Sequence, residues 1–454
     1  MAVCTREADS ASAMRLPTIS FASLLLAAAA FGQNTDIEAL SGLQFNFGNP
    51  GARSLAMGGA FIGLADDASA AEANPAGLTV LRKAEVSIEA RQTTTAQRFV
   101  TGGTFPFVTT ADFASRRSAI SFASAVIPTE HSVVALYYHR PLSFRNRVDV
   151  TGRYSTPIFF VGPNGPVTRE QCAAMPDCQQ HQIYPFSTAA DIDMETFGMA
   201  AARRFGTVSI GAAVRYHSFR ETAVTFRRDL DLPDQPMFTI TQTNGGQIVG
   251  RGRDSAVTLV AGIHWMPLAN LSVGAIYKEG ASFPAPISAA VAGESPAIIG
   301  TTRFHVPSTL GAGVGYRVTP ALTVNADAVH VSYAHLTDQF LSVIEYGSGD
   351  VEQLAGYETR NGIEWHGGLE YFVLSHVPLA VRAGWWRDPA HGIAYRAPLV
   401  SAHDVAARIL FPGNRAENHY SVGMGLSWPR FEVDAADDTS RSLKTASISV
   451  IARQ

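Results

Sequence analysis

The chain has 454 residues, a net charge of -4 and 16% charged residues, against about 25% in ordinary soluble domains. This balance gives no electrostatic reason to expect nucleic-acid binding. Hydrophobic residues make up 46% of the chain, yet its mean hydropathy is only +0.06. Beyond the N-terminus no apolar run approaches the roughly 18 residues of a membrane helix, which excludes a helical membrane bundle. A large soluble β protein and a transmembrane β-barrel remain.

The N-terminus resembles an export signal. Arg15 precedes an apolar core at residues 21–31, and a small-x-small pattern at residues 30–32 predicts cleavage after Gly32. Residues 1–13 are polar and partly acidic, unlike a secretion signal, so Met14 is an alternative start. We therefore expect a leader over residues 1–32. The alternative is a buried N-terminal helix.

A stretch dense in Gly and Ala follows the leader: residues 49–78 read NPGARSLAMGGAFIGLADDASAAEANPAGL. Small residues let one backbone pack closely against another. Asp66 or Asp67 is expected to cap a short helix over residues 68–73, and Pro75 to end it. A helix this short needs packing from outside to persist. The stretch therefore predicts a compact plug held inside a larger structure.

From residue 84 onward the dominant hydrophobic period is two. Residues 208–216 and 420–428, for example, place apolar side chains on one face and polar or very small ones on the other, as in β-strands. The pattern predicts about fourteen strands. They are expected near residues 84–96, 118–127, 131–140, 192–203, 208–217, 255–265, 271–278, 308–317, 322–333, 364–373, 379–386, 420–428, 431–436 and 444–452.

Short turns and long excursions alternate between these strands. This asymmetry is typical of an outer-membrane barrel with short periplasmic turns and long outer loops. Aromatic residues are expected at both membrane interfaces. They are Tyr138, Tyr216, Tyr277, Tyr333 and Trp385 at the outer ends and Trp265, Tyr316 and Trp428 at the inner ends. The alternative is a soluble β-sandwich or propeller with an aromatic core.

A barrel of about fourteen strands is too wide for its own side chains to fill. We therefore expect an all-β fold, a transmembrane antiparallel β-barrel over residues 84–454. Residues 33–83 are expected to form an N-terminal hatch that obstructs its lumen.

The hatch stretch resembles the N-terminal hatch of the FadL/TodX outer-membrane transporters. The resemblance is carried by Gly58 and Gly59, Asp66 and Asp67, and the run Asn74, Pro75, Ala76, Gly77 and Leu78. Residues 306–327 and 379–385 look like strands of the same family. The resemblance implies a monomer, without enzymatic activity, that takes up long-chain fatty acids or hydrocarbons and contacts outer-membrane lipids, with no cofactor or metal.

Two departures from the family are visible. Members commonly end on an aromatic residue, whereas this chain ends on Arg453 and Gln454. The family also has a kinked third strand that opens a lateral window in the wall. The third expected strand, at residues 132–140, has no Gly or internal Pro to mark such a kink, so the sequence places no window.

The resemblance implies capture and diffusion, in which an apolar groove among the outer loops receives the ligand. The aromatic candidates for this groove are Phe105, Phe107, Phe159, Phe160, Phe283 and Phe304. A ligand carboxylate needs a cation, because an unpaired buried charge is costly. The inward-facing candidates are Arg91, Arg215, Lys278 and Arg382. Alternatively, these cations pair with the hatch or with Glu89, Asp327, Glu432 or Asp434.

Two further features leave alternatives open. Cys172 and Cys178 lie close together in a loop-like stretch, and an oxidising compartment would let them form a disulfide. No His or Cys cluster of zinc-like spacing accompanies them, so we expect no metal site. The long loops also suit a different function, that of a PorV-like carrier barrel that binds secreted proteins.

Overall fold

The structure is a computed structural model. It describes residues 47–104, 107–150, 154–162, 165–167, 171, 179–183, 186–227, 247–290, 297–338, 342–344, 351–353, 356–373, 378–398, 408 and 411–454, all within one compact unit. The leader, its cleavage site after Gly32, residues 33–46 and both Cys172 and Cys178 lie outside these ranges, so those predictions stay predictions. None of the helices that the structure describes is long and apolar enough to cross a membrane.

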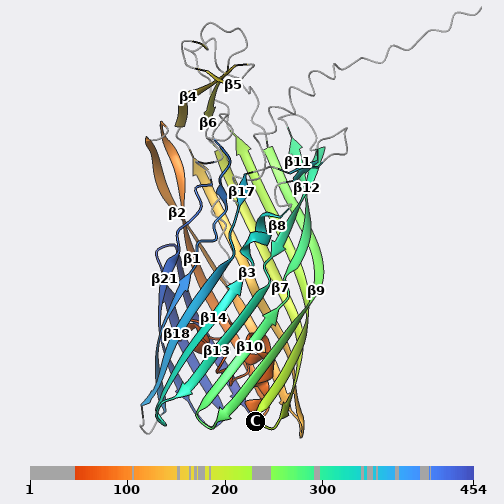
Figure 1. Cartoon of the computed structure of the whole chain (residues 1–454), viewed down its shortest axis with the longest axis vertical. Helices are drawn as coiled ribbons and strands as arrows, with labels where there is room; N and C mark the ends of the chain where they lie inside the picture. Colours follow the sequence, from red (N-terminus) through yellow and green to blue (C-terminus); the bar gives the residue numbers. More distant parts are fainter. Residues whose placement is uncertain are drawn as a thin grey trace, which may run out of the picture. The chain divides into compact units, whose positions relative to one another are not determined.

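Fourteen antiparallel strands close into a barrel, as predicted (Figure 1). In order around the wall they are β1 (Glu85–Thr104), β2 (Phe107–Pro128), β3 (Ser132–Val150), β7 (Phe186–Phe205), β8 (Val208–Arg227), β9 (Gln247–Leu268), β10 (Leu271–Lys278), β13 (Thr309–Arg317), β14 (Leu322–Val331), β18 (Gly362–Val373), β19 (Leu379–Asp388), β21 (Glu417–Ser427), β22 (Phe431–Thr439) and β23 (Leu443–Arg453). Pairing of β23 with β1 closes the wall.

Smaller elements extend or decorate this wall. Strands β11 (Ala281–Ala290) and β12 (Ala297–Val306) pair with each other beyond the ends of β10 and β13, and β11 also pairs with β9. The other short strands are β4 (Tyr154–Gly162), β5 (Gly165–Val167), β6 (Gln179–Ile183), β15 (Ser342–Ile344), β16 (Val351–Gln353), β17 (Tyr357–Glu358) and β20 (Ala394–Tyr395). The helices are α3 (Ala52–Ala56), α4 (Ala70–Ala73) and the 3-10 helices η1 (Pro75–Val80) and η2 (Tyr333–Thr337).

Several strands run further from the short turns than the alternation predicted. The strand expected at residues 208–217, for example, is β8, which continues to Arg227. Its outward positions there are polar, as at Arg220 and Thr222, so the apolar alternation ends before the strand does. The long excursion expected between the strands at residues 271–278 and 308–317 is also wrong in part, because that segment contains β11 and β12. Pro284 and Pro286 lie within β11, and proline is uncommon inside strands because it has no backbone N–H to donate.

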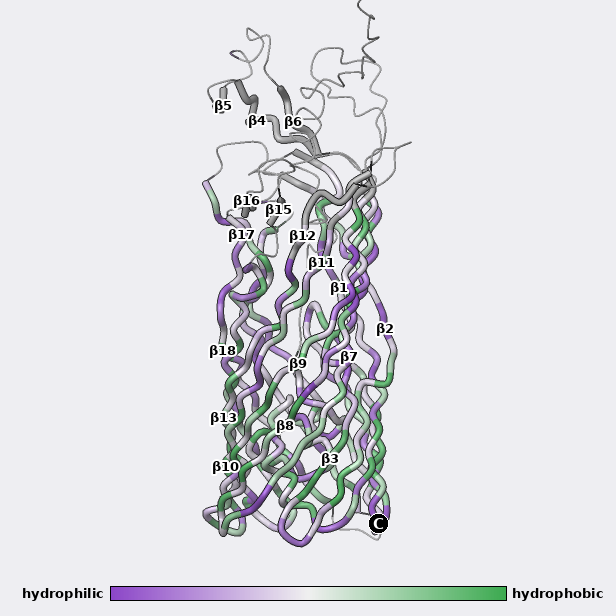
Figure 2. Tube along the Cα trace, turned by 90° about the vertical axis from the view of Figure 1, so that its right-hand side faces the viewer, coloured by the Kyte–Doolittle hydropathy of each residue, from purple (hydrophilic) through white to green (hydrophobic). Residues whose placement is uncertain are grey.

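The wall presents large apolar side chains outward and polar or small ones inward, and hydropathy alternates along the strands (Figure 2). Tyr216, Tyr277 and Trp385 are exposed on the outer face, as expected, although Tyr216 lies in the middle of β8 and not at its outer end. Tyr333 is not. It lies on η2, fully buried, and donates a hydrogen bond to Glu364 at 2.7 Å.

The last strand closes the barrel without a terminal aromatic residue. Arg453 forms ion pairs with Glu85 of β1, at 2.9 Å, and with Glu432 of β22, at 2.6 Å. These contacts join the final strand to both of its neighbours.

Candidate functional site

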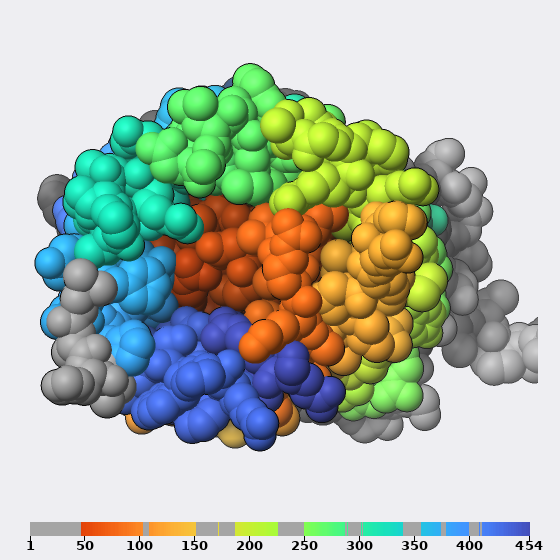
Figure 3. All heavy atoms as spheres, turned by 90° about the horizontal axis from the view of Figure 1, so that it is seen from below, coloured from red at the N-terminus to blue at the C-terminus, as the bar shows by residue number. Residues whose placement is uncertain are grey.

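Residues 50–81, here called the plug segment, fill the barrel at the end that carries the short turns (Figure 3). Glycines on the inner face of the wall allow its close approach. A Cβ atom added at Gly211 of β8 would overlap the backbone of Ala76, and one at Gly384 of β19 would overlap that of Gly58. The very small residues on one face of the strands therefore make room for the plug segment. Gly58 and Gly59 themselves adopt positive φ angles of 65° and 77°.

Polar contacts hold the plug segment to the wall at two further places. The Asn74 side chain donates hydrogen bonds to the carbonyl oxygens of Ile62 and, in β9, of Ile263, both at 3.1 Å. Its oxygen accepts a hydrogen bond from the Ala76 amide, where Pro75 begins η1. Asp327 of β14 accepts hydrogen bonds from the amides of Phe61 and Ile62, at 2.6 and 2.7 Å.

Asp66 and Asp67 do not cap a helix as expected. The helix is α4, it begins at Ala70, and Asp67 instead accepts hydrogen bonds from the amide and hydroxyl of Ser69. Asp66 pairs with Arg53 at 2.6 Å, and Arg53 also pairs with Glu370 of β18 at 2.8 Å. The pair therefore helps to join the plug segment to the wall through Arg53.

Two of the candidate cations converge on one carboxylate of the plug segment, that of Glu72 in α4. Lys278 lies 3.2 Å and Arg215 lies 3.4 Å from it, and Tyr137 donates a hydrogen bond to it at 2.8 Å. Burial acts to raise the pKa of Glu72, but Lys278 and Arg215 outweigh it and hold that pKa well below its ordinary value. One anion thus faces two cations. Sequence reasoning did not single out Glu72.

The other two cations pair with carboxylates elsewhere. Arg91 pairs with Glu89 at 2.8 Å. The Arg382 side chain is completely buried and pairs with Glu370 and Asp434, at 2.7 and 2.6 Å. A buried guanidinium held by several carboxylates has a structural role, because removal of one partner leaves an unpaired buried charge.

An apolar cluster lies next to Lys278 and Arg215. Phe219, Phe283 and Phe304 are buried on the lumen faces of β8, β11 and β12, and Phe219 stacks on the other two at centroid distances of 4.5 and 4.9 Å. Met194 and Ala281 belong to the same buried cluster and line a cavity of about 40 Å³ together with Glu72, Arg215 and Lys278. An apolar surface thus leads to two cations.

The aromatic candidates were expected on loops, and the structure changes this for two of them. Phe283 and Phe304 belong to strands that face the lumen. Phe105 lies outside the described ranges. For Phe107, Phe159 and Phe160 only the backbone is described, in β2 and β4.

The wall has a separation between β2 and β3. Their pairing begins near the short turn and ends at Phe122 and His139. Beyond these residues β2 pairs with β1 and β3 pairs with β7. A bulge in β3 between His139 and Leu142, at Pro141, shifts its register against β7 there. The expectation that the third strand lacks an internal proline is therefore wrong, because the strand continues to Val150.

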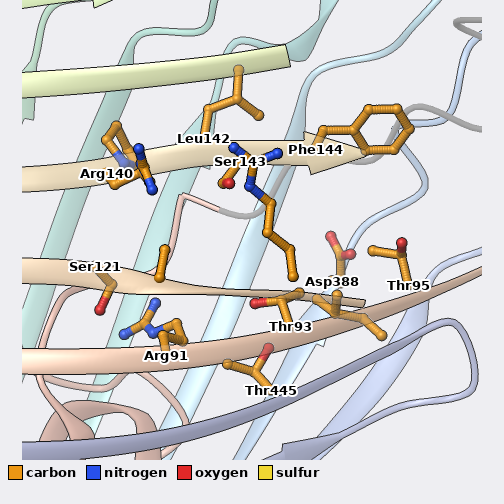
Figure 4. A pocket seen from close by; sticks show the side chains of 14 residues that line it. Arg91, Thr93, Thr95, Ser121, Arg140, Leu142, Ser143, Phe144, Asp388 and Thr445 are labelled. Atoms are coloured by element: carbon orange, nitrogen blue, oxygen red, sulfur yellow. The ribbon is translucent and has the colours of Figure 1, made fainter. Parts of the chain in front are cut away.

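Cavities lie on both sides of the wall at this separation. Inside, a cavity of about 100 Å³ is lined by residues of β1, β2, β3, β19 and β23, including Arg91, Ser121, Arg140 and Leu142 (Figure 4). On the outer face, an apolar groove of about 830 Å³ includes Tyr138, whose register partner is Ala123, next to the last β2–β3 pair. The separation thus lies between a lumen cavity and an outward-facing apolar groove.

Ion pairs bridge the separation in place of backbone hydrogen bonds. Arg117 of β2 reaches past β3 to Asp191 and Asp193 of β7, at 2.9 and 3.2 Å. Arg140 and Arg145 of β3 pair with the same two carboxylates, at 3.2 and 2.6 Å. These residues, here called the ionic bridge, join β2 to β7.

Arg117→Ala is expected to loosen β2 from β3 near the loop end. Each partly exposed ion pair contributes up to about 1 kcal/mol to the stability of the fold. The barrel should therefore stay folded while the separation between β2 and β3 widens. Spin labels at Thr110 of β2 and Arg147 of β3 would report the widening as a longer mean distance between the labels and a broader distance distribution. Arg98→Ala is the matched control, because its pair with Asp112 lies within the β1–β2 hairpin. Equal distributions in both variants would refute the bridge.

Among the comparisons with known proteins, the one with solved structures identifies the fold. No family model matches the sequence, and no curated protein matches it either. Among solved structures, the chain is similar to a Pseudomonas aeruginosa FadL homologue, with 15% identity, a TM-score of 0.59, and coverage of 90% of this chain and 98% of the other.

The Ralstonia pickettii toluene transporter TbuX gives 14% identity and a TM-score of 0.55, and the P. putida toluene transporter TodX 13% and 0.52. Both matches cover 90% of this chain and 99% of the other. The resemblance to the FadL/TodX transporters is thus confirmed for the fold: this chain has the barrel fold of a FadL homologue and of two toluene transporters.

Proposed function

We propose that this chain is an outer-membrane channel for the uptake of hydrophobic or amphipathic small molecules, such as long-chain fatty acids or hydrocarbons. The observation that carries the proposal is the buried aromatic cluster of Phe219, Phe283 and Phe304, which leads to Lys278 and Arg215 above the plug segment. The shared fold with the FadL homologue and the toluene transporters supports it. No bond is made or broken in this mechanism, and no cofactor is needed.

The apolar cluster supplies affinity for the ligand's tail. Each buried CH₂ group contributes roughly 0.8 kcal/mol, so a long chain gains strongly from contact with aromatic side chains. Lys278 and Arg215 supply a cationic end point for a carboxylate head group. Among the residues that the structure describes, Glu72 is the one carboxylate that pairs with both of them, so together they retain positive charge for a second anion.

The plug segment acts as the hatch in this mechanism. It closes the lumen toward the periplasm, and the separation between β2 and β3 gives a sideways route toward the apolar outer groove. Release along this route requires the ionic bridge at Arg117 to open. The exposed apolar side chains of the wall support a location in the outer membrane, where the chain would act as a monomer surrounded by lipids.

Ligand binding to the purified barrel tests this function. The folded chain in detergent is titrated with a long-chain fatty acid and with toluene, beside Lys278→Met and Arg215→Met. We expect saturable binding of both ligands, and weaker binding of the acid alone in the two variants. If only toluene binds, the carboxylate site is refuted and the channel remains. If neither binds, uptake is refuted, and a co-purifying secreted protein would then indicate the carrier function.

A further inference from the structure

Arginines gather on the outer face of the wall above its apolar band. Arg220 of β8 and Arg253 of β9 are direct register partners and both are exposed. Arg251 is exposed two residues further along β9. Arg303 of β12 is also exposed and lies opposite Pro284 of β11. We call Arg220, Arg251, Arg253 and Arg303 the arginine row.

The row has no anionic partner within the part of the chain that the structure describes. None of its four guanidinium groups has an ion pair or a side-chain hydrogen bond there. Asp193 is the register partner of Arg220 in β7, but its carboxylate is held by Arg117 and Arg140. Side chains directly opposite on a sheet lie about 5 Å apart, and like charges there destabilise the pair. An anion between Arg220 and Arg253 would remove this repulsion.

The position of the row matches a lipid head group. Tyr216 and Val257 are exposed in the apolar band, and Arg220 and Arg253 lie beyond them on the same faces of β8 and β9, toward the loop end. The intervening outward positions are Ser218 and Ser255, which are also register partners. Four residues of a tilted strand raise a side chain by about 10 Å, from the hydrocarbon into the polar head-group region. The serine hydroxyls can donate hydrogen bonds to a phosphate, and the arginines beyond them can add charge-assisted hydrogen bonds.

We infer that the arginine row binds the phosphate of an anionic lipid in the outer leaflet, with the lipid's acyl chains against the apolar band below. This inference rests on the outer-membrane location proposed above. It differs from the proposed uptake route, because the row faces outward and the route runs through the lumen.

Lipid binding by the purified chain tests the inference. The folded barrel in a neutral detergent is titrated with diphosphorylated lipid A, with dephosphorylated lipid A and with inorganic phosphate. We expect the diphosphorylated lipid to bind and the double variant Arg220→Ser/Arg253→Ser to lower its affinity about tenfold or more, since each arginine removed takes away hydrogen bonds between charged groups. Binding should fall with added salt.

The matched control is Arg116→Ser/Lys444→Ser. It removes the same charge from outward positions of β2 and β23, which are separated by Thr94 of β1 and are not direct partners. It should keep nearly the wild-type affinity. Equal losses in both double variants would overturn the inference, as would equal binding of inorganic phosphate or of the dephosphorylated lipid. Fatty-acid and toluene binding on the same samples report separately on the proposed uptake function.

Discussion

Gly211→Leu is expected to unseat the plug segment and leave an open, folded barrel. Even a Cβ at this position overlaps the backbone of Pro75 and Ala76, which cannot move aside as a flexible side chain could. Overpacking lowers the stability of a fold by about 1–3 kcal/mol, or more where the added atoms overlap backbone. The plug segment can relieve this overlap by moving away from Gly211. Single channels in planar bilayers should show a large, steady conductance that the wild-type chain lacks.

The neighbouring residue provides the control for this prediction. Ala212 lies on the opposite face of the same strand and is exposed, so Ala212→Leu adds the same volume toward lipid. It should leave conductance unchanged. If Gly211→Leu forms a folded barrel with wild-type conductance, the seating of the plug segment against Gly211 does not close the lumen.

Glu72→Gln is expected to loosen the plug segment and to strengthen binding of a carboxylate ligand. Removing one partner of a buried ion pair costs about 3–5 kcal/mol, because Lys278 and Arg215 are left without their shared anion. Amide hydrogen exchange of α4 and η1 should therefore become faster. A fatty acid should bind more tightly, since its carboxylate no longer competes with Glu72, while toluene affinity should change little.

A double variant tests whether the unpaired cations cause these effects. Glu72→Gln/Lys278→Met removes a stranded cation as well, so it should recover part of the lost protection in the plug segment. It should also lose the gain in fatty-acid affinity. If Glu72→Gln leaves exchange and both affinities unchanged, the pairing of Glu72 with the two cations has no role in holding the plug or in ligand binding.

Alternation along the chain was sufficient to predict the barrel. Strands that face lipid on one side must be apolar there, so the period of two is visible wherever the wall crosses the apolar band. Beyond that band the outward face of β8 turns polar at Arg220, and the signal disappears although the strand continues. The inward glycines were visible as very small residues, but only the structure shows that Gly211 and Gly384 receive the plug segment.

The candidate site depended on partners that are distant in sequence. Lys278 and Arg215 were recognisable as inward-facing cations, yet their shared partner Glu72 is far away in the chain and carries no local signal. The ionic bridge is similar, because Arg117 meets Asp193 only across an intervening strand. Pro141 was the available clue to the separated wall, and it was missed because the third strand was expected to end at Arg140.

Uptake by whole cells tests the central claim most directly. Gram-negative cells without their own hydrophobic-uptake channel would express the chain, with heat-modifiability on gels to show that the barrel is folded. The initial rates of uptake of a labelled long-chain fatty acid and of labelled toluene would then be measured. We predict a several-fold rise over cells without the chain for at least one of the two. A folded barrel in the outer membrane that raises neither rate would contradict the proposed function.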